Sequence, residues 1–298
     1  MPTFALLTFA IVAIVISIFS QSPQASAIPV SLQTVFRHTI PARQQIVQPK
    51  IQARSAVVLD EQSGYRLLDI SADREQPIAS LTKLMTALVF LDHNPGWDKS
   101  ITITKEDLRG GAKANIFPGD QIKIQDLFNA ALVASDNSGI SALVRSTGLN
   151  EKDFVTAMNN KANELHVRGI HFADPTGLDT NNQGSALAVA KLAQVAFNKK
   201  EIVEALGHSS YGFSVSNNVN REVKSTNELL GKNLPKGSIL VGGKTGHLNE
   251  AGFCFAGVFK YNGHTLATAV LGAPIDEERF SETIKILDWT MRAYVWEN

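Results

Sequence analysis

Three short motifs hold the residues of this chain that are best suited to chemistry. They are Ser80-Leu-Thr-Lys83, Ser135-Asp-Asn137 and Lys244-Thr-Gly246, and they occur once each, in that order. The first pairs a hydroxyl with an amine that could remove its proton, as a serine nucleophile requires. The second offers another hydroxyl and an amide, and the third offers an ammonium and a hydroxyl that suit a carboxylate. Each motif alone arises often by chance, so their conjunction is what predicts nucleophilic catalysis.

Lys83 is the candidate base for Ser80 because the two residues lie three positions apart. On a helix, residues i and i+3 share a face, so the amine could reach the hydroxyl. The surrounding segment Ala79–Val89 is mostly apolar, and burial there would lower the pKa of the amine enough to leave part of it neutral. The alternative is a capping serine followed by a solvated lysine, which is common at helix starts. An unpaired amine would be costly in this apolar context, which favours the catalytic interpretation.

The other two motifs lie in segments that could aim side chains into a cleft. Ser135 could relay a proton and Asn137 could bind an amide group, although the same residues also suit a turn or a helix N-cap. Lys244 and Thr245 suit a substrate carboxylate, and Gly246 leaves room for close approach to the backbone. The third motif also matches the end of a phosphate-binding loop. A serine stands where that loop needs its first glycine, and the flanking residues are strand-like, which disfavours a nucleotide site.

The elements that must position these motifs form a helical middle between two β-rich ends. Apolar periodicity and turn residues predict strands at 55–59, 65–68, 238–241, 251–259 and 265–271, and helices at 81–91, 125–134, 137–145, 150–165, 186–197 and 278–296. The last two strands flank Tyr261-Asn-Gly263, a hairpin signal, so an antiparallel order is expected. Strands at both ends of the chain imply one sheet assembled from distant segments.

Composition and charge exclude several classes of protein. Of the 298 residues, 44% are hydrophobic and 19% are charged, which is enough to bury a sizeable core. The 28 basic and 28 acidic residues balance, and no cluster of Lys or Arg indicates a nucleic-acid partner. The single cysteine, Cys254, allows no intrachain disulfide and is expected to be a small apolar core residue.

The amino-terminal segment has the pattern of an export signal. The first 36 residues carry no charged side chain, residues 4–19 are almost entirely apolar, and Ala25-Ser-Ala27 offers a cleavage site. We therefore expect residues 1–27 to be a signal peptide. An uncleaved membrane anchor is the alternative, because the positive residues usual before the apolar run are missing. Residues 28–52 are polar and contain three prolines, which predicts a linker before a catalytic domain at 53–298.

With these motifs in place, the chain resembles the serine-type D-alanyl-D-alanine carboxypeptidase family, the low-molecular-mass penicillin-binding proteins of bacterial cell-wall metabolism. The resemblance covers roughly residues 54–275 and extends beyond the three motifs. It is carried by the longer stretches Ala79–Ala87, Phe172–Leu178 and Lys244–Gly252. It implies an α+β, penicillin-recognising serine peptidase fold, in which an antiparallel sheet packs with an α-helical region and the active site lies in the cleft between them.

The resemblance also implies a role for each motif residue in an acyl-enzyme mechanism. Ser80 would attack the carbonyl that joins D-Ala to its neighbour, Lys83 would accept the proton, and Ser135 would pass one to the leaving amine. The backbone N–H groups of Ser80 and His247 would form the oxyanion hole. Water would then hydrolyse the ester, with no metal and no organic cofactor. The substrate-binding residues implied in the same way are Asn137, Lys244, Thr245, Gly246 and His247.

The implied substrates are peptidoglycan stem peptides or their crosslinks, which places the enzyme in the periplasm or another extracytoplasmic space. Possible anchoring through residues 4–19 would add contact with the membrane, and β-lactam antibiotics would acylate Ser80 as covalent inhibitors.

The chain departs from the frequent Ser-Gly-Asn form of the second motif, because Asp136 stands in the middle. It also ends about 50 residues after Lys244, a short form that resembles the D,D-endopeptidase branch. Carboxypeptidase and endopeptidase activity therefore both stay open.

Two other functions compete with a D,D-peptidase. A β-lactamase needs a base for fast deacylation, and the class A string Glu-x-x-Leu-Asn does not follow Ser135. A catalytically silent cell-wall binding module could share the fold, but the intact Ser80 and Lys83 argue against it. The seven histidines form no H-E-x-x-H zinc motif, and no serine stands in a G-x-S-x-G string, so neither a zinc site nor a Ser-His-Asp triad is predicted.

Overall fold

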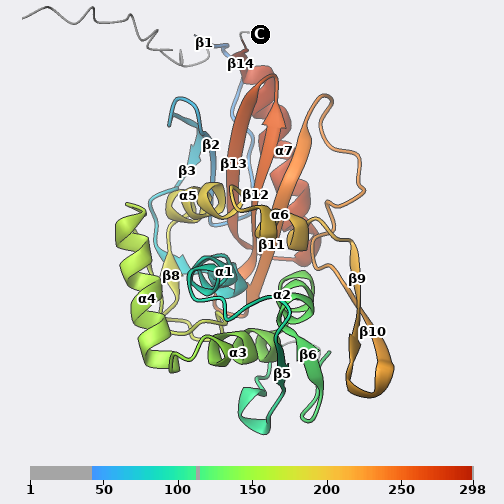
Figure 1. Cartoon of the computed structure of the whole chain (residues 1–298). Helices are drawn as coiled ribbons and strands as arrows, with labels where there is room; N and C mark the ends of the chain where they lie inside the picture. Colours follow the sequence, from blue (N-terminus) through green and yellow to red (C-terminus); the bar gives the residue numbers. More distant parts are fainter. Residues whose placement is uncertain (1–41, 112–114, 297–298) are drawn as a thin grey trace, which may run out of the picture. The chain divides into compact units, whose positions relative to one another are not determined.

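A five-stranded antiparallel sheet forms the centre of the structure (Figure 1). The structure is a computed structural model that describes residues 42–111 and 115–296, so the predicted signal peptide and the first part of the predicted linker lie outside the described residues. The strand order is β11-β12-β13-β2-β3, so the first long strands of the chain pair with the last. Their bounds are Ser55–Asp60 (β2), Arg66–Ile70 (β3), Ile239–Leu248 (β11), Gly252–Tyr261 (β12) and His264–Ala273 (β13).

Both faces of this sheet are covered, which explains the apolar character of its strands. In β2, Val57 packs into one hydrophobic cluster, while Ala56 and Val58 pack into a second. This is the alternation expected of a strand whose neighbouring side chains point to opposite faces. Because neither face is solvated, such a strand reads as a near-continuous apolar run.

Helices cover the two faces separately. The last helix, α7, packs on β12 and β13, and α5 packs on the opposite face against β13 and β2 (Figure 1). The other helices complete a helical region on the α5 side. The helix bounds are Lys83–Asp92 (α1), Ile124–Val133 (α2), Asn137–Ser146 (α3), Glu151–Glu164 (α4), Ala186–Ala196 (α5), Lys200–Leu206 (α6) and Asp276–Ala293 (α7). The predicted α+β architecture is confirmed.

Short strands and turns tie the loops to this body. The short strands are Ala42–Arg43 (β1), Gln76–Pro77 (β4), Ser100–Thr102 (β5), Gln121–Lys123 (β6), Ile170–His171 (β7), Gln183–Gly184 (β8), Ser210–Val215 (β9), Val219–Lys224 (β10) and Tyr294–Val295 (β14). Three 3₁₀ turns lie at Ala79–Thr82, Lys105–Asp107 and Ser216–Asn218. Strands β9 and β10 form a hairpin that projects beside α2 and β6 (Figure 1).

All predicted strands and helices are present, but three details differ. Strand β11 was predicted to end where the third motif begins, and instead continues through the motif to Leu248, because it pairs with β12 along its length. The last helix ends at Ala293 rather than at residue 296, since Tyr294 and Val295 form β14 and pair with β1. Helix α6 and the β9–β10 hairpin were not predicted. The hairpin has a recognisable signal in Asn217-Asn218, both of which adopt left-handed backbone with φ of 60° and 59°.

Residues 42–52, which the sequence assigns to the linker, pack against α7. The backbone N–H of Gln44 donates to the Ala293 carbonyl at 2.7 Å, and Trp289 Nε1 donates to the Val47 carbonyl at 2.8 Å. Ile46 and Ile51 pack against the α7 side of the core. The packed part of the chain therefore begins upstream of residue 53. Among the helices of residues 42–111 and 115–296, none is both long and apolar enough to cross a membrane.

Candidate active site

The first motif sits where a 3₁₀ turn leads into α1. The turn Ala79–Thr82 carries Ser80, which is half-buried, and Lys83 begins α1 with its side chain fully buried. The distance between Lys83 Nζ and Ser80 Oγ is 2.8 Å. The predicted contact between the two residues is therefore present, and the amine lies within reach of the hydroxyl proton.

The Lys83 amine has two further oxygen partners. It donates to Asn137 Oδ1 at 2.6 Å and to the Thr176 carbonyl at 2.5 Å. A neutral amine has two hydrogens and one lone pair. If the hydrogens go to Asn137 and Thr176, the lone pair remains for the Ser80 hydroxyl. The arrangement can therefore hold a neutral Lys83 ready to accept the proton of Ser80.

Burial favours the neutral form of the Lys83 amine. It lowers the pKa of this amine from the usual 10.5 to about 7. The carboxylates of Asp174 and Asp136 act in the opposite direction, since each favours the charged amine, but their effect is smaller than that of burial. Near neutral pH a substantial fraction of Lys83 is thus a free base.

The second motif lies in the turn between α2 and α3. Ser135 has a left-handed backbone with φ of 56°, which costs energy for a residue with a Cβ and is often found at functional sites. Asp136 caps α3 by accepting from the Gly139 N–H at 3.0 Å. Its other oxygen accepts from the backbone N–H and the side-chain amide of Asn115, at 3.1 Å each. The unusual middle residue of this motif therefore has a structural function.

Asn137 uses both ends of its amide within the protein. Its Oδ1 accepts from Lys83, and its Nδ2 donates to the Gly110 carbonyl at 2.7 Å. The side chain also borders the pocket described below. Asn137 therefore orients Lys83, and it can bind a substrate amide by exchanging one of these two bonds.

The third motif lies inside β11 and not after it. Lys244 is 1% exposed, and its Nζ donates to Ser135 Oγ at 2.8 Å and to the Thr245 carbonyl at 2.9 Å. Burial lowers the pKa of Lys244, and the positive charges of Lys83 and Arg279 lower it further. Lys244 thus touches the second hydroxyl of the site, Ser135, in the same way that Lys83 touches the first.

The other two residues of the third motif meet the nucleophile turn and the hairpin. A Cβ on Gly246 would lie 2.9 Å from the Ile78 carbonyl oxygen and 3.1 Å from the Ser80 nitrogen, so only glycine lets β11 pass this close to the turn. The Thr245 hydroxyl lies 2.5 Å from that of Thr226, which follows β10.

A tight turn at residues 174–177 closes the site behind Lys83. Asp174 Oδ1 accepts from the backbone N–H and the hydroxyl of Thr176 and, at 2.6 Å, from the Gly177 N–H. These bonds fix the Thr176 carbonyl that accepts from Lys83. Gly177 has a φ of +86° and packs directly against the nucleophile turn, where a Cβ would come within 2.1 Å of the Ala79 carbonyl oxygen.

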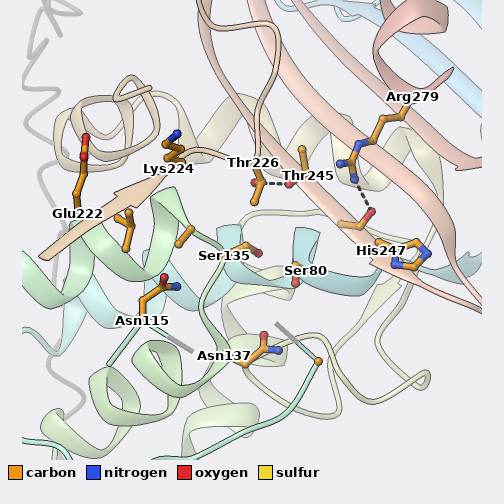
Figure 2. Close-up of a pocket in the computed structure, with 14 residues that line it drawn as sticks. Ser80, Asn115, Ser135, Asn137, Glu222, Lys224, Thr226, Thr245, His247 and Arg279 are labelled. Atoms are coloured by element: carbon orange, nitrogen blue, oxygen red, sulfur yellow. Dashed lines mark hydrogen bonds between the residues drawn. The ribbon is translucent and has the colours of Figure 1, made fainter. Parts of the chain in front are cut away.

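The motifs border a pocket of about 460 Å³ (Figure 2). Its lining residues are Ser80, Gly111, Asn115, Ala134, Ser135, Asn137, Glu222, Val223, Lys224, Thr226, Thr245, Gly246, His247 and Arg279. Six of the eight predicted site residues are among them. The other two, Lys83 and Lys244, are buried behind the pocket, where each bonds to one of its two serine hydroxyls.

Arg279 is a pocket residue that the sequence did not predict. Its Nη1 donates to the Gly246 carbonyl at 3.3 Å, its Nη2 forms an ion pair with Asp276, and the guanidinium lies 5.5 Å from the centre of the Phe253 ring. It places a cation on the pocket wall, whereas the predicted cation, Lys244, lies behind it. No local motif marks Arg279. Its i, i+3 spacing from Asp276 is typical of ion pairs on the exposed face of any helix.

Two histidines and the cysteine have ordinary structural surroundings. The exposed ring of His247 stacks on Phe253 with centroids 4.0 Å apart, and His264 bonds to Asp60 at 2.9 Å. Across the two described ranges, 42–111 and 115–296, no three His, Cys, Asp or Glu side chains are grouped to hold a metal ion. Cys254 is fully buried, and burial raises the pKa of its thiol to about 11, which leaves it unreactive.

Comparison with known proteins identifies the family. The profile of the D-alanyl-D-alanine carboxypeptidase family matches residues 42–275, which is most of the chain. The chain belongs to this family. Membership confirms both the resemblance and the predicted enzyme class, a serine-type D-Ala-D-Ala hydrolase.

Relatives within the D-alanyl-D-alanine carboxypeptidase family carry two kinds of name. A D-alanyl-D-alanine endopeptidase of Haemophilus influenzae is 33% identical over 222 residues, which cover 74% of this chain and 74% of that protein. The D-alanyl-D-alanine carboxypeptidase DacF of Bacillus subtilis is 27% identical over 254 residues, which cover 82% of this chain but 63% of that protein.

Solved structures support the fold of this D-alanyl-D-alanine carboxypeptidase family member. The DD-transpeptidase of Streptomyces K15 superposes with a TM-score of 0.76 at 24% identity, covering 83% of this chain and 100% of that one. The D-alanyl-D-alanine carboxypeptidase of Mycobacterium tuberculosis superposes with the same TM-score and identity, covering 87% of this chain and 100% of that one. The predicted penicillin-recognising fold is confirmed.

Proposed function

We propose that this protein is a serine D,D-peptidase of peptidoglycan metabolism, which cleaves peptide bonds after D-Ala through an acyl-enzyme on Ser80. The observation that carries the proposal is the 2.8 Å contact between Ser80 Oγ and the buried amine of Lys83, whose pKa is lowered to about 7. A charged surface lysine could not take up the serine proton at neutral pH, whereas this amine can.

The first half of the reaction forms the acyl-enzyme. Ser80 Oγ attacks the carbonyl carbon of D-Ala, and its proton moves to Lys83 Nζ. The carbonyl oxygen becomes an oxyanion, which the backbone N–H groups of Ser80 and His247 stabilise. When the intermediate collapses, the C–N bond breaks and the leaving amine takes a proton from Ser135. Lys244 bonds to that hydroxyl and restores its proton.

The second half releases the acyl group. After acylation, Lys83 carries the proton of Ser80 and Lys244 has given one up through Ser135, so the transfer of one proton from Lys83 to Lys244 restores both amines. A water molecule then gives a proton to Lys83, and the resulting hydroxide attacks the ester carbonyl. The C–O bond to Ser80 breaks, and Ser80 regains its proton. Oxygen, proton and acyl group therefore balance without any metal or cofactor.

The pocket wall offers a place for the carboxylate of the substrate. Thr245 presents its hydroxyl there, and Arg279 supplies a guanidinium beside Gly246. An arginine fork suits a carboxylate better than a lysine does, because it can donate two parallel hydrogen bonds. We therefore assign carboxylate binding to Thr245 and Arg279, and we assign to Lys244 the protonation of Ser135.

The substrate also determines where the enzyme works. Peptidoglycan lies outside the cytoplasmic membrane, so the protein acts in an extracytoplasmic space. The apolar run at residues 4–19 agrees with export, either as part of a signal peptide cleaved after Ala27 or as a retained anchor in the periplasm.

Acylation by benzylpenicillin tests the proposed function. We expect intact-mass spectrometry to show a persistent adduct of one penicillin on the wild-type protein and none on Ser80→Ala, because the hydroxyl is the attacking group. Rapid drug turnover without a persistent adduct would indicate a β-lactamase instead. Absence of both adduct and turnover would contradict catalysis and favour a binding module.

The pH dependence of acylation follows from the lowered pKa of Lys83. Protonated Lys83 cannot accept a proton, so the acylation rate should fall as pH decreases through about 7, with about one tenth of the plateau rate at one pH unit below. Above about pH 8 the rate should level off, whereas an ordinary lysine would still be titrating near 10.5. Stopped-flow measurement between pH 5 and 9 checks this, and a rate that stays constant from pH 5 to 8 would contradict the assignment of Lys83 as base.

A further inference from the structure

Two charged residues of the pocket have no part in the reaction described above. Glu222 and Lys224 line the cavity from β10, where they lie two positions apart and so project from the same face of the strand. Both are exposed, and within the described part of the chain neither forms an ion pair. The pocket therefore extends beyond the two serines to a wall that carries one negative and one positive charge.

The hairpin that carries these charges is held firmly against the helical region. Arg221 lies on the face of β10 opposite to that of Glu222 and Lys224, and its guanidinium donates to both carboxylate oxygens of Asp120, with 2.8 Å between Nη2 and Oδ1. The same guanidinium lies 4.8 Å from the centre of the Phe117 ring. At the base of β9, the Tyr211 hydroxyl donates to Asp126 at 2.7 Å. These contacts, spread along both strands, fix the position of the charged wall.

The end of β10 is also tied directly to the catalytic motifs. The backbone N–H of Thr226 donates to the Val133 carbonyl at 3.3 Å, two residues before Ser135, and its hydroxyl contacts that of Thr245. Lys224 is only two residues away from this double contact. The charged wall thus has a defined place relative to the reacting groups, unlike a pair of charges on a free loop.

The side of the pocket that this wall borders is the side of the leaving group. Figure 2 shows Ser135 between Ser80 and the β10 residues Lys224 and Glu222, while His247 lies on the other side of Ser80. In the proposed reaction Ser135 gives its proton to the departing amine, so that amine must lie toward Ser135. The carbon attached to the amine also bears the carboxylate that Thr245 and Arg279 bind, so the rest of the leaving group is what can extend toward β10.

This geometry distinguishes the two substrates that the family membership leaves open. When a terminal D-Ala is released, the leaving group ends at its own methyl and carboxylate, which Thr245 and Arg279 already accommodate. When a crosslink is cut, the departing amine belongs to a second stem peptide, whose chain continues past that point. A cavity of about 460 Å³ that reaches β10 has room for such a continuation.

We propose that Glu222 and Lys224 form a subsite for the departing strand of a crosslink, which makes this enzyme favour crosslink cleavage. Lys224 binds a carboxylate of the second peptide, and Glu222 accepts hydrogen bonds from its N–H groups. The reaction itself is unchanged, because the same C–N bond breaks and the amine of the second peptide leaves with the proton of Ser135. This inference rests on the proposed function and specifies its substrate.

The test compares a crosslinked peptide dimer with a monomeric pentapeptide that ends in D-Ala-D-Ala, using the full chain. For Lys224→Ala we expect the ratio of kcat/KM, dimer over monomer, to fall about tenfold, as for loss of one hydrogen bond to a charged group. Lys224→Glu should lower the ratio further, because it repels the same carboxylate, and Glu222→Gln should lower it less. Lys199→Ala removes an exposed lysine away from the pocket and should leave the ratio unchanged.

Acylation of the same preparations by benzylpenicillin tells a failure of the proposed subsite apart from a failure of the proposed peptidase function. If the variants acylate normally and the ratio stays at the wild-type value, or if both substrates lose rate equally, the subsite is wrong and the proposed function stands. If wild-type protein neither acylates nor cleaves either peptide, both are wrong. A selective loss for the dimer, in the order predicted for the three variants, supports the subsite.

Discussion

Replacing Lys83 with arginine is expected to lower the rate of acylation by benzylpenicillin at least about 10⁴-fold, the scale on which loss of a catalytic base acts. Arginine stays protonated at every accessible pH, so it cannot take the proton of Ser80. Its guanidinium would also carry a permanent charge into a fully buried site. The measurement is the time course of adduct formation by mass spectrometry, at the plateau pH of the wild type.

A second variant separates chemistry from folding. Lys83→Met keeps the length of the side chain and removes the amine, so it should lose acylation to the same degree. Its free energy of unfolding should stay within about 2 kcal/mol of the wild type, because relief from desolvating the amine offsets the loss of its bonds to Asn137 and Thr176. Urea denaturation checks this. Acylation at an unchanged rate in a folded Lys83→Met protein would refute the assignment of the base.

Replacing Gly177 with alanine is expected to lower the free energy of unfolding by about 2 to 5 kcal/mol, as a left-handed residue and an overpacked contact combined would predict. The added Cβ would approach the Ala79 carbonyl oxygen to 2.1 Å, and this backbone oxygen cannot move without shifting Ser80. Displacement of the nucleophile by about 1 Å should reduce the acylation rate by about 10²-fold. Urea denaturation and the penicillin time course measure the two effects.

Gly148 provides a matched control for this variant. It also has a left-handed backbone, with φ of +82°, but an added Cβ there would meet nothing within 4 Å. Gly148→Ala should therefore cost about 1 to 2 kcal/mol from backbone strain alone and leave acylation intact. Equal losses of stability and activity in the two variants would show that the contact with the nucleophile turn has no special importance.

Much of the fold was predictable because local patterns survive in the final structure. The paired strands around Gly263 and the helix that begins after Ser80 follow from turn residues and apolar runs, and both are present. Prediction failed where local signals were weak. The third motif was expected to end β11, yet pairing with β12 carries the strand through Lys244, Thr245 and Gly246. The β9–β10 hairpin lacks a continuous apolar face, so its strands did not stand out.

The sequence by itself determined the family, the fold class and the contact between Ser80 and Lys83. That contact is local, because residues three apart on a helical turn meet whatever surrounds them. Only the tertiary structure decided how the remaining groups are used. Lys244 reaches Ser135 across 109 residues of chain, and Arg279 and the charged wall of β10 come to the same pocket from elements without a motif. The lowered pKa of Lys83 also requires the complete core, because desolvation depends on everything packed around the amine and not on its neighbours in sequence.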